Sequence, residues 1–428
     1  MESNLIRNTL PLLLVFLFLS CGRIDTITGA TTKTPEKTEI RESTEKGDRT
    51  LSTSFNASGI ALYKKLAANG KKADENIVVS PFSVGMAMTM VLSGASGETA
   101  KEMAKVLENT LSKEGMDKAA RTLTDRINAL NGQDTEISTA NALCLCEDGK
   151  TLSDSYKNVL KRDYRAEMFS SPVVGPINAW VAKRTRGKIE TILDSLPPNC
   201  VCVILNAVYF KGKWLREFDS KRTRPAPFHL TAAKKVKIPM MTQTKRFALA
   251  KGDGFRAISL PYKGGKLAMV VLLPDKLDGL GDVTEKLSDA NVSKLLDDLE
   301  KPRAGKETNV AMPKFKIEYG AGLIPAFKQL GMRLPFSSKD ADFGGMLGKK
   351  SALGAVWIAD IQHKAFIEVD EKGTEAAAAT AVVMQTKSVR MEIEMFSIDH
   401  PFLFMIVERK TKSILFMGRY LGPPSAKR

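Results

Sequence analysis

Residues 371–384 read EKGTEAAAATAVVM, and this stretch is the most informative one in the 428-residue chain. The four consecutive alanines favour a helix by local propensity. As a strand, the segment has one face of small or apolar side chains, namely Thr374, Ala376, Ala378, Thr380, Val382 and Met384. The other face is mixed, with Glu375, Ala377, Ala379, Ala381, Val383 and Gln385. A strand with one face free of bulky and charged groups could enter between existing strands.

The residues that follow are polar and carry two basic side chains. They read Thr386-Lys387-Ser388-Val389-Arg390, and a charged stretch comes next. A polar segment with exposed lysine and arginine is typical of the sites that trypsin-like proteases cut.

The remaining pattern predicts one large α+β domain. Helical spacing of apolar residues marks 54–68, 81–92, 98–107 and 118–130, and Ser80 before Pro81 is a helix-start signal. Strand-like runs cover 200–209, 257–261, 267–274, 309–312, 365–370, 401–408 and 413–418. Helices dominate the first half and strands the second, without a long linker or an internal repeat. This order favours one domain with mixed sheets.

The N-terminus predicts export. Residues 10–19 are apolar apart from Pro11, with Arg7 before them and Ser20-Cys21-Gly22 after them. Ten residues are too few for a bilayer, which needs about 20, so we expect a signal peptide over 1–22 and no membrane span. A second interpretation is a bacterial lipoprotein site with lipid attached to Cys21. Residues 23–50 almost lack large apolar side chains, which predicts a disordered tail before a folded domain over 51–428.

Four cysteines remain after the predicted leader. Cys144 and Cys146, and Cys200 and Cys202, form two C-x-C pairs within strand-like runs, where alternation places both members of a pair on one face. This spacing is a poor match for a zinc site. Buried free thiols are the more common outcome, and a cross-strand disulfide is the alternative in an oxidising compartment.

Charge and motifs narrow the classes of function. The formal charge is +16, which favours polyanionic partners. The basic clusters at 183–188, 221–224 and 234–237 lack the spaced aromatics of a base-stacking platform, so we expect no nucleic-acid partner and interpret them as solvated faces. There are only three histidines, and no hydrolase, metalloprotease or phosphate-loop motif occurs. The sequence therefore predicts neither an enzyme nor a metal site.

Five segments in order make the chain resemble the serpin family over about residues 54–424. Residues 371–380 are similar to the family's proximal hinge, and residues 396–406 match the signature beyond the reactive loop. Residues 206–214 resemble the central-strand and breach segment. Ser80-Pro81-Phe82-Ser83 resembles the shutter at the start of helix B, and residues 178–189 resemble the helix F segment. The stretch before that helix, residues 168–176, is shorter than is usual in the family.

The resemblance implies a fold and a mechanism. The fold is a helical bundle plus three mixed β-sheets with an exposed reactive-centre loop. Such a chain is a secreted inhibitor that acts as a suicide substrate, and its cleaved loop inserts into the central sheet. The alternative is a non-inhibitory serpin, such as a carrier or chaperone. The implied hinge residues are Glu371, Gly373, Thr374, Glu375, Ala376, Ala377, Ala378, Ala379 and Thr380.

The resemblance also implies the scissile bond and its supporting residues. The residue sixteen after the hinge glutamate is Lys387, so the bond is Lys387–Ser388 and the target is a trypsin-like serine protease held as a covalent acyl complex. Arg390 is the rival position. The implied shutter residues are Ser80, Ser83, Asn206 and His363, and Trp214 is the breach tryptophan. The helix that binds heparin in some members carries Lys118, Arg121 and Arg126, so a sulfated polysaccharide is a further possible partner. No cofactor is implied, and we expect a monomer.

Overall fold

The computed structural model describes residues 35–69, 74–146, 152–301, 307–347, 356–374 and 393–424, and of residues 35–45 only the backbone. Residues 43–428 group into one compact unit, separate from residues 1–42. The described helices are α1 (Pro35–Ala67), α2 (Pro81–Leu92), α3 (Gly97–Val106), α4 (Lys113–Asn128), α5 (Asp154–Asp163), α6 (Val174–Arg184), α7 (Leu280–Lys286), α8 (Asp289–Glu300) and α9 (Ile324–Gln329).

Serine caps explain where several helices begin. Ser80, Ser112, Ser153 and Ser288 each accept a hydrogen bond from a backbone N–H of the following first turn. In α2 the cap is followed by Pro81, whose missing N–H is unneeded at the first helical position. Every residue of α2 is buried, so this helix lies in the core.

The strands of the described residues form three sheets. One has the order β1 (Ile77–Val79), β16 (Ser413–Tyr420), β15 (Phe402–Glu408), β9 (Leu267–Pro274), β8 (Phe255–Pro261) and β7 (Ala248–Gly252). A four-stranded sheet has the order β14 (Glu394–Ser397), β10 (Thr308–Pro313), β6 (Lys235–Lys245) and β5 (Arg224–His229). The third, here called the central sheet, has the order β11 (Phe315–Gly322), β12 (Ile358–Val369), β13 (Gly373–Thr374), β4 (Cys202–Lys213), β2 (Thr135–Leu145) and β3 (Glu167–Ser170). The predicted α+β class is confirmed.

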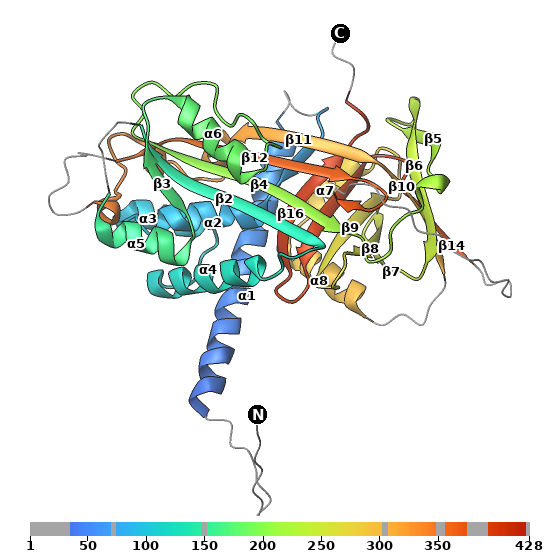
Figure 1. Cartoon of the computed structure of the whole chain (residues 1–428), viewed down its shortest axis with the longest axis horizontal. Helices are drawn as coiled ribbons and strands as arrows, with labels where there is room; N and C mark the ends of the chain where they lie inside the picture. The colour runs from blue at the N-terminus through green and yellow to red at the C-terminus, as the bar shows by residue number, and fades with distance from the viewer. Residues whose placement is uncertain are drawn as a thin grey trace, which may run out of the picture. The chain divides into compact units, whose positions relative to one another are not determined.

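The central sheet is covered on both faces. Ile204 and Val208 of β4 join the large core that includes α2, whereas Val203 and Leu205 join a smaller cluster with Ile177 of α6. Figure 1 shows α6 on one side of β2, β4 and β12 and the helices α2 to α5 on the other. Because both faces are buried, β4 is a nearly continuous apolar run without polar alternation.

Helix α1 begins earlier than the sequence predicts. It starts at Pro35, inside the segment 23–50 for which the sequence predicts a disordered tail. Residues 35–50 are rich in Glu, Lys and Arg, which favour helix, and they extend the helix that Leu51 and Phe55 anchor in the core. Asp48 is 1% exposed and pairs with Arg126 of α4. Among the described residues, no helix has the length and hydrophobicity needed to cross a membrane.

Candidate functional site

The short strand β13 lies at one end of a parallel strand pair. Along the rest of their length, β12 and β4 pair directly and in parallel, from Ile358 opposite Cys202 to Phe366 opposite Tyr209. At the end of this pair β13 enters between the two strands, antiparallel to both, with Thr374 opposite Val369 of β12 and Gly212 of β4. The central sheet therefore already admits the first two residues of an additional strand.

The two residues of β13 fit this position closely. A Cβ atom on Gly373 would lie 2.0 Å from the carbonyl oxygen of Gly212, so only glycine is tolerated there. Thr374 is 0% exposed, and its Oγ1 lies 2.8 Å from the hydroxyl of Tyr262. The rest of the predicted hinge, Glu375–Thr380, and the predicted bond between Lys387 and Ser388 lie outside the described residues.

An ionic contact holds the turn before β13. The Glu371 carboxylate lies 2.8 Å from Lys314 Nζ and accepts a 2.7 Å hydrogen bond from the Thr223 hydroxyl. Burial alone would raise the pKa of Glu371, but the hydrogen bonds from Lys314 and Thr223 outweigh it and the pKa lies below its ordinary value. Glu371 is thus charged at neutral pH and ties the hinge to the four-stranded sheet.

Trp214 supports the same turn from the end of β4. Its indole N–H donates to the carbonyl oxygen of Asp370 at 2.9 Å, and its backbone N–H donates to Lys372 O at 2.8 Å. The indole is 1% exposed and stacks on Tyr262 with the ring centroids 4.6 Å apart. Because Tyr262 also contacts Thr374, the stacked Trp214–Tyr262 pair contacts both the turn before β13 and β13 itself.

The four predicted shutter residues come together under the middle of the β4–β12 pair. Asn206 of β4 lies opposite His363 of β12 in the ladder, and His363 Nδ1 is 2.5 Å from Asn206 Oδ1. Asn206 Nδ2 reaches Ser83 Oγ at 2.6 Å, and Ser80 Oγ caps α2 by accepting from Ser83 N at 3.0 Å. These four side chains are fully buried, and together they connect β4, β12 and the start of α2.

Burial keeps His363 neutral. It lowers the pKa of His363 to about 3. The partners agree with one neutral tautomer, in which Nδ1–H donates to Asn206 and Nε2 accepts from the backbone N–H of Ser80 at 3.4 Å. A polar latch of this kind holds two parallel strands together without a buried charge.

Sequence reasoning missed three partners. Asn141 of β2 lies 2.5 Å from Asn206 Nδ2, Lys314 pairs with Glu371, and Tyr262 contacts Thr374. Each is distant in sequence from its partner and lies in an ordinary strand or loop run. Only the folded arrangement identifies them.

The predicted heparin-binding residues of α4 have other contacts. Arg121 Nε lies 3.4 Å from the fully buried carboxylate of Asp163, and Arg126 Nη2 lies 3.4 Å from buried Asp48. Lys118 is exposed. Two of the three cations therefore neutralise buried acids, and the three do not form a free cationic surface.

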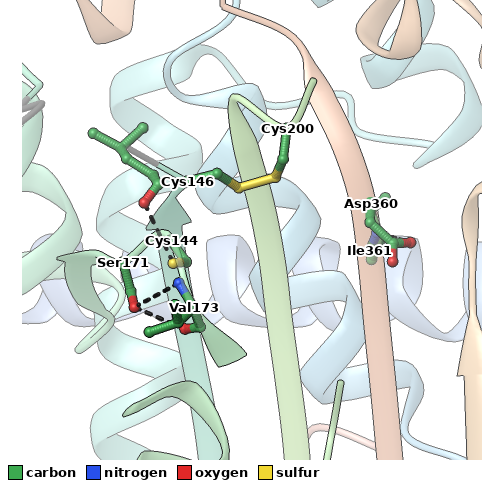
Figure 2. Close-up of a disulfide and its surroundings, with 8 residues drawn as sticks. Cys144, Cys146, Ser171, Val173, Cys200, Asp360 and Ile361 are labelled. Carbon is green, nitrogen blue, oxygen red and sulfur yellow. Dashed lines mark hydrogen bonds between the residues drawn. A yellow bond between two sulfur atoms is a disulfide. The ribbon is translucent and has the colours of Figure 1, made fainter. Parts of the chain in front are cut away.

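Two of the four cysteines are buried free thiols, as expected, and the other two form a disulfide, which was the alternative. Cys146 and Cys200 form a disulfide with a Cα–Cα distance of 5.5 Å, whereas Cys144 and Cys202 are free and buried. Figure 2 shows the bond beside the ends of β2 and β4, apart from Asp360 and Ile361 of β12. The same-face prediction is wrong for Cys200 and Cys202, because Cys200 precedes β4 and packs on the α6 side while Cys202 faces the α2 side. Burial raises the pKa of Cys144 to about 11, so this thiol is protonated at neutral pH.

Known proteins are similar to this chain in both architecture and sequence. The family model described as "Serpin (serine protease inhibitor)" matches residues 53–423. Human Serpin B8 is 37% identical over 85% of this chain and 97% of its own length. The leukocyte elastase inhibitor of Xenopus tropicalis is 33% identical over 85% of this chain and 96% of its own. Among solved structures, the thermophilic serpin tengpin in its native state is similar with a TM-score of 0.78 at 26% identity, covering 88% of this chain and 94% of that one.

Proposed function

The chain belongs to the serpin family, and we propose that it is a secreted suicide inhibitor of trypsin-like serine proteases. The proposal rests above all on β13, which has entered between β12 and β4 with a buried threonine at its leading position. Insertion of serpin reactive loops is a recognised form of strand addition. The register of β13 defines how the following residues would continue.

Continuing this register places the small face of the hinge against the core. Since Thr374 lies opposite Gly212 and Val369, Ala376 would lie beside Phe210 and Thr380 would lie between Asn206 and His363. Phe210 belongs to the buried core on the α2 side, so Ala376 would face apolar side chains. The composition of residues 374–380 fits this position.

The chemistry belongs to the protease. Its serine attacks the carbonyl carbon of Lys387, the bond to the Ser388 nitrogen breaks, and Lys387 remains attached to the protease as an acyl ester. The released hinge then enters between β4 and β12. One parallel pairing is replaced by two antiparallel ladders, which are slightly more stable per residue. Movement of the acyl-linked protease with the strand distorts its active site and traps the complex.

Lys387 carries the proposed specificity. A lysine side chain fits a primary specificity pocket with an acidic base, as in trypsin. The small Ser388 after the bond leaves room for the protease surface. Arg390 is the alternative position three residues later.

Secretion is supported by two features of the chain. The apolar run over 10–19 has the length of a signal-peptide core, which gives the proposed division into a leader over 1–22 and a serpin domain over 51–428. The Cys146–Cys200 disulfide fits an oxidising compartment.

A denaturing gel tests the inhibitory mechanism. Mixing the chain with trypsin should give a covalent band at the summed mass, and Lys387→Gln should abolish it. The matched variant Arg390→Gln should retain it. Cleavage without any covalent band would overturn the proposal and identify a substrate or a non-inhibitory member, and loss only in Arg390→Gln would move the scissile bond.

A further inference from the structure

The chain contains two acceptor sequences for N-linked glycans. Asn56-Ala57-Ser58 lies in α1 and Asn291-Val292-Ser293 lies in α8, and the sequence holds no further Asn-x-Ser or Asn-x-Thr. An acceptor of this kind is expected on the surface of a secreted protein, where the transferred sugar extends into solvent. The two asparagines lie in opposite environments, and the difference bears on how the chain is exported.

Asn56 is a buried structural residue, with only 5% of its surface exposed. Its Nδ2 donates one hydrogen bond to the carbonyl oxygen of Lys412 at 2.9 Å and another to the carboxylate of Asp289. Its Oδ1 accepts a hydrogen bond from the backbone N–H of Ile414 at 2.9 Å. Both hydrogens of the amide nitrogen are therefore in use, and they attach α1 to the start of α8 and to the turn before β16.

The neighbours of Asn56 form a buried polar cluster. Ser52, one helical turn before Asn56, has its Oγ 2.7 Å from Ser413 Oγ, and Ser413 Oγ lies 2.7 Å from Thr411 Oγ1. All three hydroxyl residues are buried. A sugar linked to Asn56 would have to separate α1 from this turn, because no solvent path leads away from the side chain.

Glycan transfer to Asn56 is incompatible with these contacts. In the transfer, the amide nitrogen forms a bond to the anomeric carbon of a lipid-linked oligosaccharide, loses one hydrogen as a proton and releases the lipid pyrophosphate. One of the two Nδ2 hydrogen bonds is then lost, and a bulky hydrophilic group stands in the core. Displacing the side chain also leaves the Lys412 carbonyl and the Ile414 N–H buried without partners, which destabilises the fold.

Asn291 provides the comparison within the same fold. It is exposed, and its Nδ2 donates a single hydrogen bond, to the carbonyl oxygen of Lys286 at 2.9 Å. The other hydrogen of this amide has no partner among the described residues. A sugar on Asn291 would extend into solvent and leave the packing of α8 unchanged.

We infer that the chain folds only when Asn56 carries no glycan, and that it is exported by a route that forms disulfides without N-glycosylation. The second half of the inference rests on the proposed secretion. The Cys146–Cys200 disulfide fits an oxidising compartment. Among such compartments, the lumen of the endoplasmic reticulum attaches glycans to nascent Asn-x-Ser sequences, whereas the bacterial periplasm meets both conditions.

Expression in yeast tests the inference, with a yeast export signal at the N-terminus of the chain, because this secretory pathway attaches N-glycans. We expect most of the wild type to be retained in the cells with a glycan on Asn56. Ser58→Ala removes the acceptor sequence but leaves Asn56 in place, so its secretion should be severalfold higher. The matched control Ser293→Ala removes only the acceptor sequence of Asn291 and should not raise secretion. Mass spectrometry of the retained and secreted fractions assigns each glycan.

A second measurement does not depend on any substitution. An inhibitor that blocks synthesis of the lipid-linked oligosaccharide should raise the secretion of wild type to the level of Ser58→Ala. Production in a bacterial periplasm is the reference, where wild type and both variants should have the same midpoint of thermal unfolding.

Two results in yeast would overturn the inference. One is a folded, secreted wild type with a glycan on Asn56, and the other is secretion of wild type that neither Ser58→Ala nor the inhibitor raises. None of these measurements involves a protease. Absence of a covalent complex with trypsin would therefore overturn the proposed function and leave this inference standing.

Discussion

Thr374 is where the loop meets the sheet, and its environment sets what can follow it. Its side chain is fully buried and contacts the Tyr262 hydroxyl. An ion at this position would lose its hydration without a partner, at a cost of several kcal/mol. A charged side chain at position 374 should therefore hinder any step that requires this residue to remain buried in the sheet.

Thr374→Arg should turn the inhibitor into a substrate. Insertion would start more slowly, so the acyl-enzyme would hydrolyse before trapping, and the moles of inhibitor consumed per mole of trypsin should rise at least severalfold. Glu375→Arg is the matched control, because strand alternation places residue 375 on the opposite, mixed face. Equal trapping by Thr374→Arg and wild type would contradict insertion as the source of inhibition.

His363 should make stability depend on pH. Its pKa is about 3 in the folded chain and about 6.5 when unfolded, so below pH 6.5 the unfolded state binds more protons and is favoured. The contribution of His363 is complete above pH 6.5 and is lost as the pH falls towards 3, by about 1.4 kcal/mol per pH unit. Unfolding in urea at pH 7 and pH 5 should therefore differ by roughly 2 kcal/mol from this group.

The assignment to His363 has a direct check. The imidazole resonances of His363 should show no titration between pH 8 and pH 5, and His363→Gln should have a flatter pH dependence of stability than wild type. Titration of His363 near pH 6.5 would contradict the buried neutral latch.

Individual site residues were predictable to different degrees. Ser80, Ser83, Asn206 and His363 were predicted from motif resemblance, and the fold places their side chains in one hydrogen-bonded cluster. Asn141 was not predicted, because a single Asn in a strand run carries no local signal of a partner 65 residues away. The ion pairs of Arg121 and Arg126 with buried acids could not be predicted, since these partners are distant in sequence and become visible only in the fold.

At the scale of elements, local pattern predicted buried strands and capped helices better than edge strands. Helix α2 and strand β9 have the predicted bounds, because the cap before α2 and the continuous apolar run of β9 are strong signals. Strand β5 reads RPAPFH and was missed, since two prolines argue against a strand unless it lies at an edge. The short strand Gly373–Thr374 was not predicted as a separate element, because its partners on both sides come from β12 and β4, which are distant in sequence.

The disulfide should stabilise the β2–β4 half of the central sheet without blocking insertion. Cys146 and Cys200 close a loop of 54 residues that contains α5, β3 and α6. Replacing both by serine should lower the free energy of unfolding by roughly 2–4 kcal/mol. The bond does not join β4 to β12, so the covalent complex with trypsin should still form. Urea denaturation measures the loss of stability, and a denaturing gel measures formation of the covalent complex. A reducing agent should lower the stability of wild type but not that of the variant. Loss of complex formation in the variant would contradict the prediction that the disulfide does not affect insertion.

At the scale of the whole molecule, the proposed mechanism requires an unused strand position between β4 and β12. Strands β4 and β12 pair in parallel over the span that the small face of residues 374–384 could fill. The His363–Asn206 contact and the Glu371–Lys314 pair hold this arrangement at the middle and at the entry. The sequence resemblance predicted loop insertion, but the register in which an inserted Thr380 would lie between Asn206 and His363 follows only from the strand pairing of β13.

Cleavage within the reactive loop should therefore make the chain more stable. Once the loop is cut, residues 375–384 are free to extend β13 and form ladders with both β4 and β12. About ten net hydrogen bonds worth ~1 kcal/mol each would raise the midpoint of thermal unfolding on the order of 10 °C.

A protease that cuts the loop without being trapped provides the cleaved form, and calorimetry compares it with the native chain. Cleaved Thr374→Arg should gain much less, because residue 374 must stay buried for the strand to enter. An unchanged midpoint in cleaved wild type would show that the loop does not insert, whatever the gel with trypsin reports.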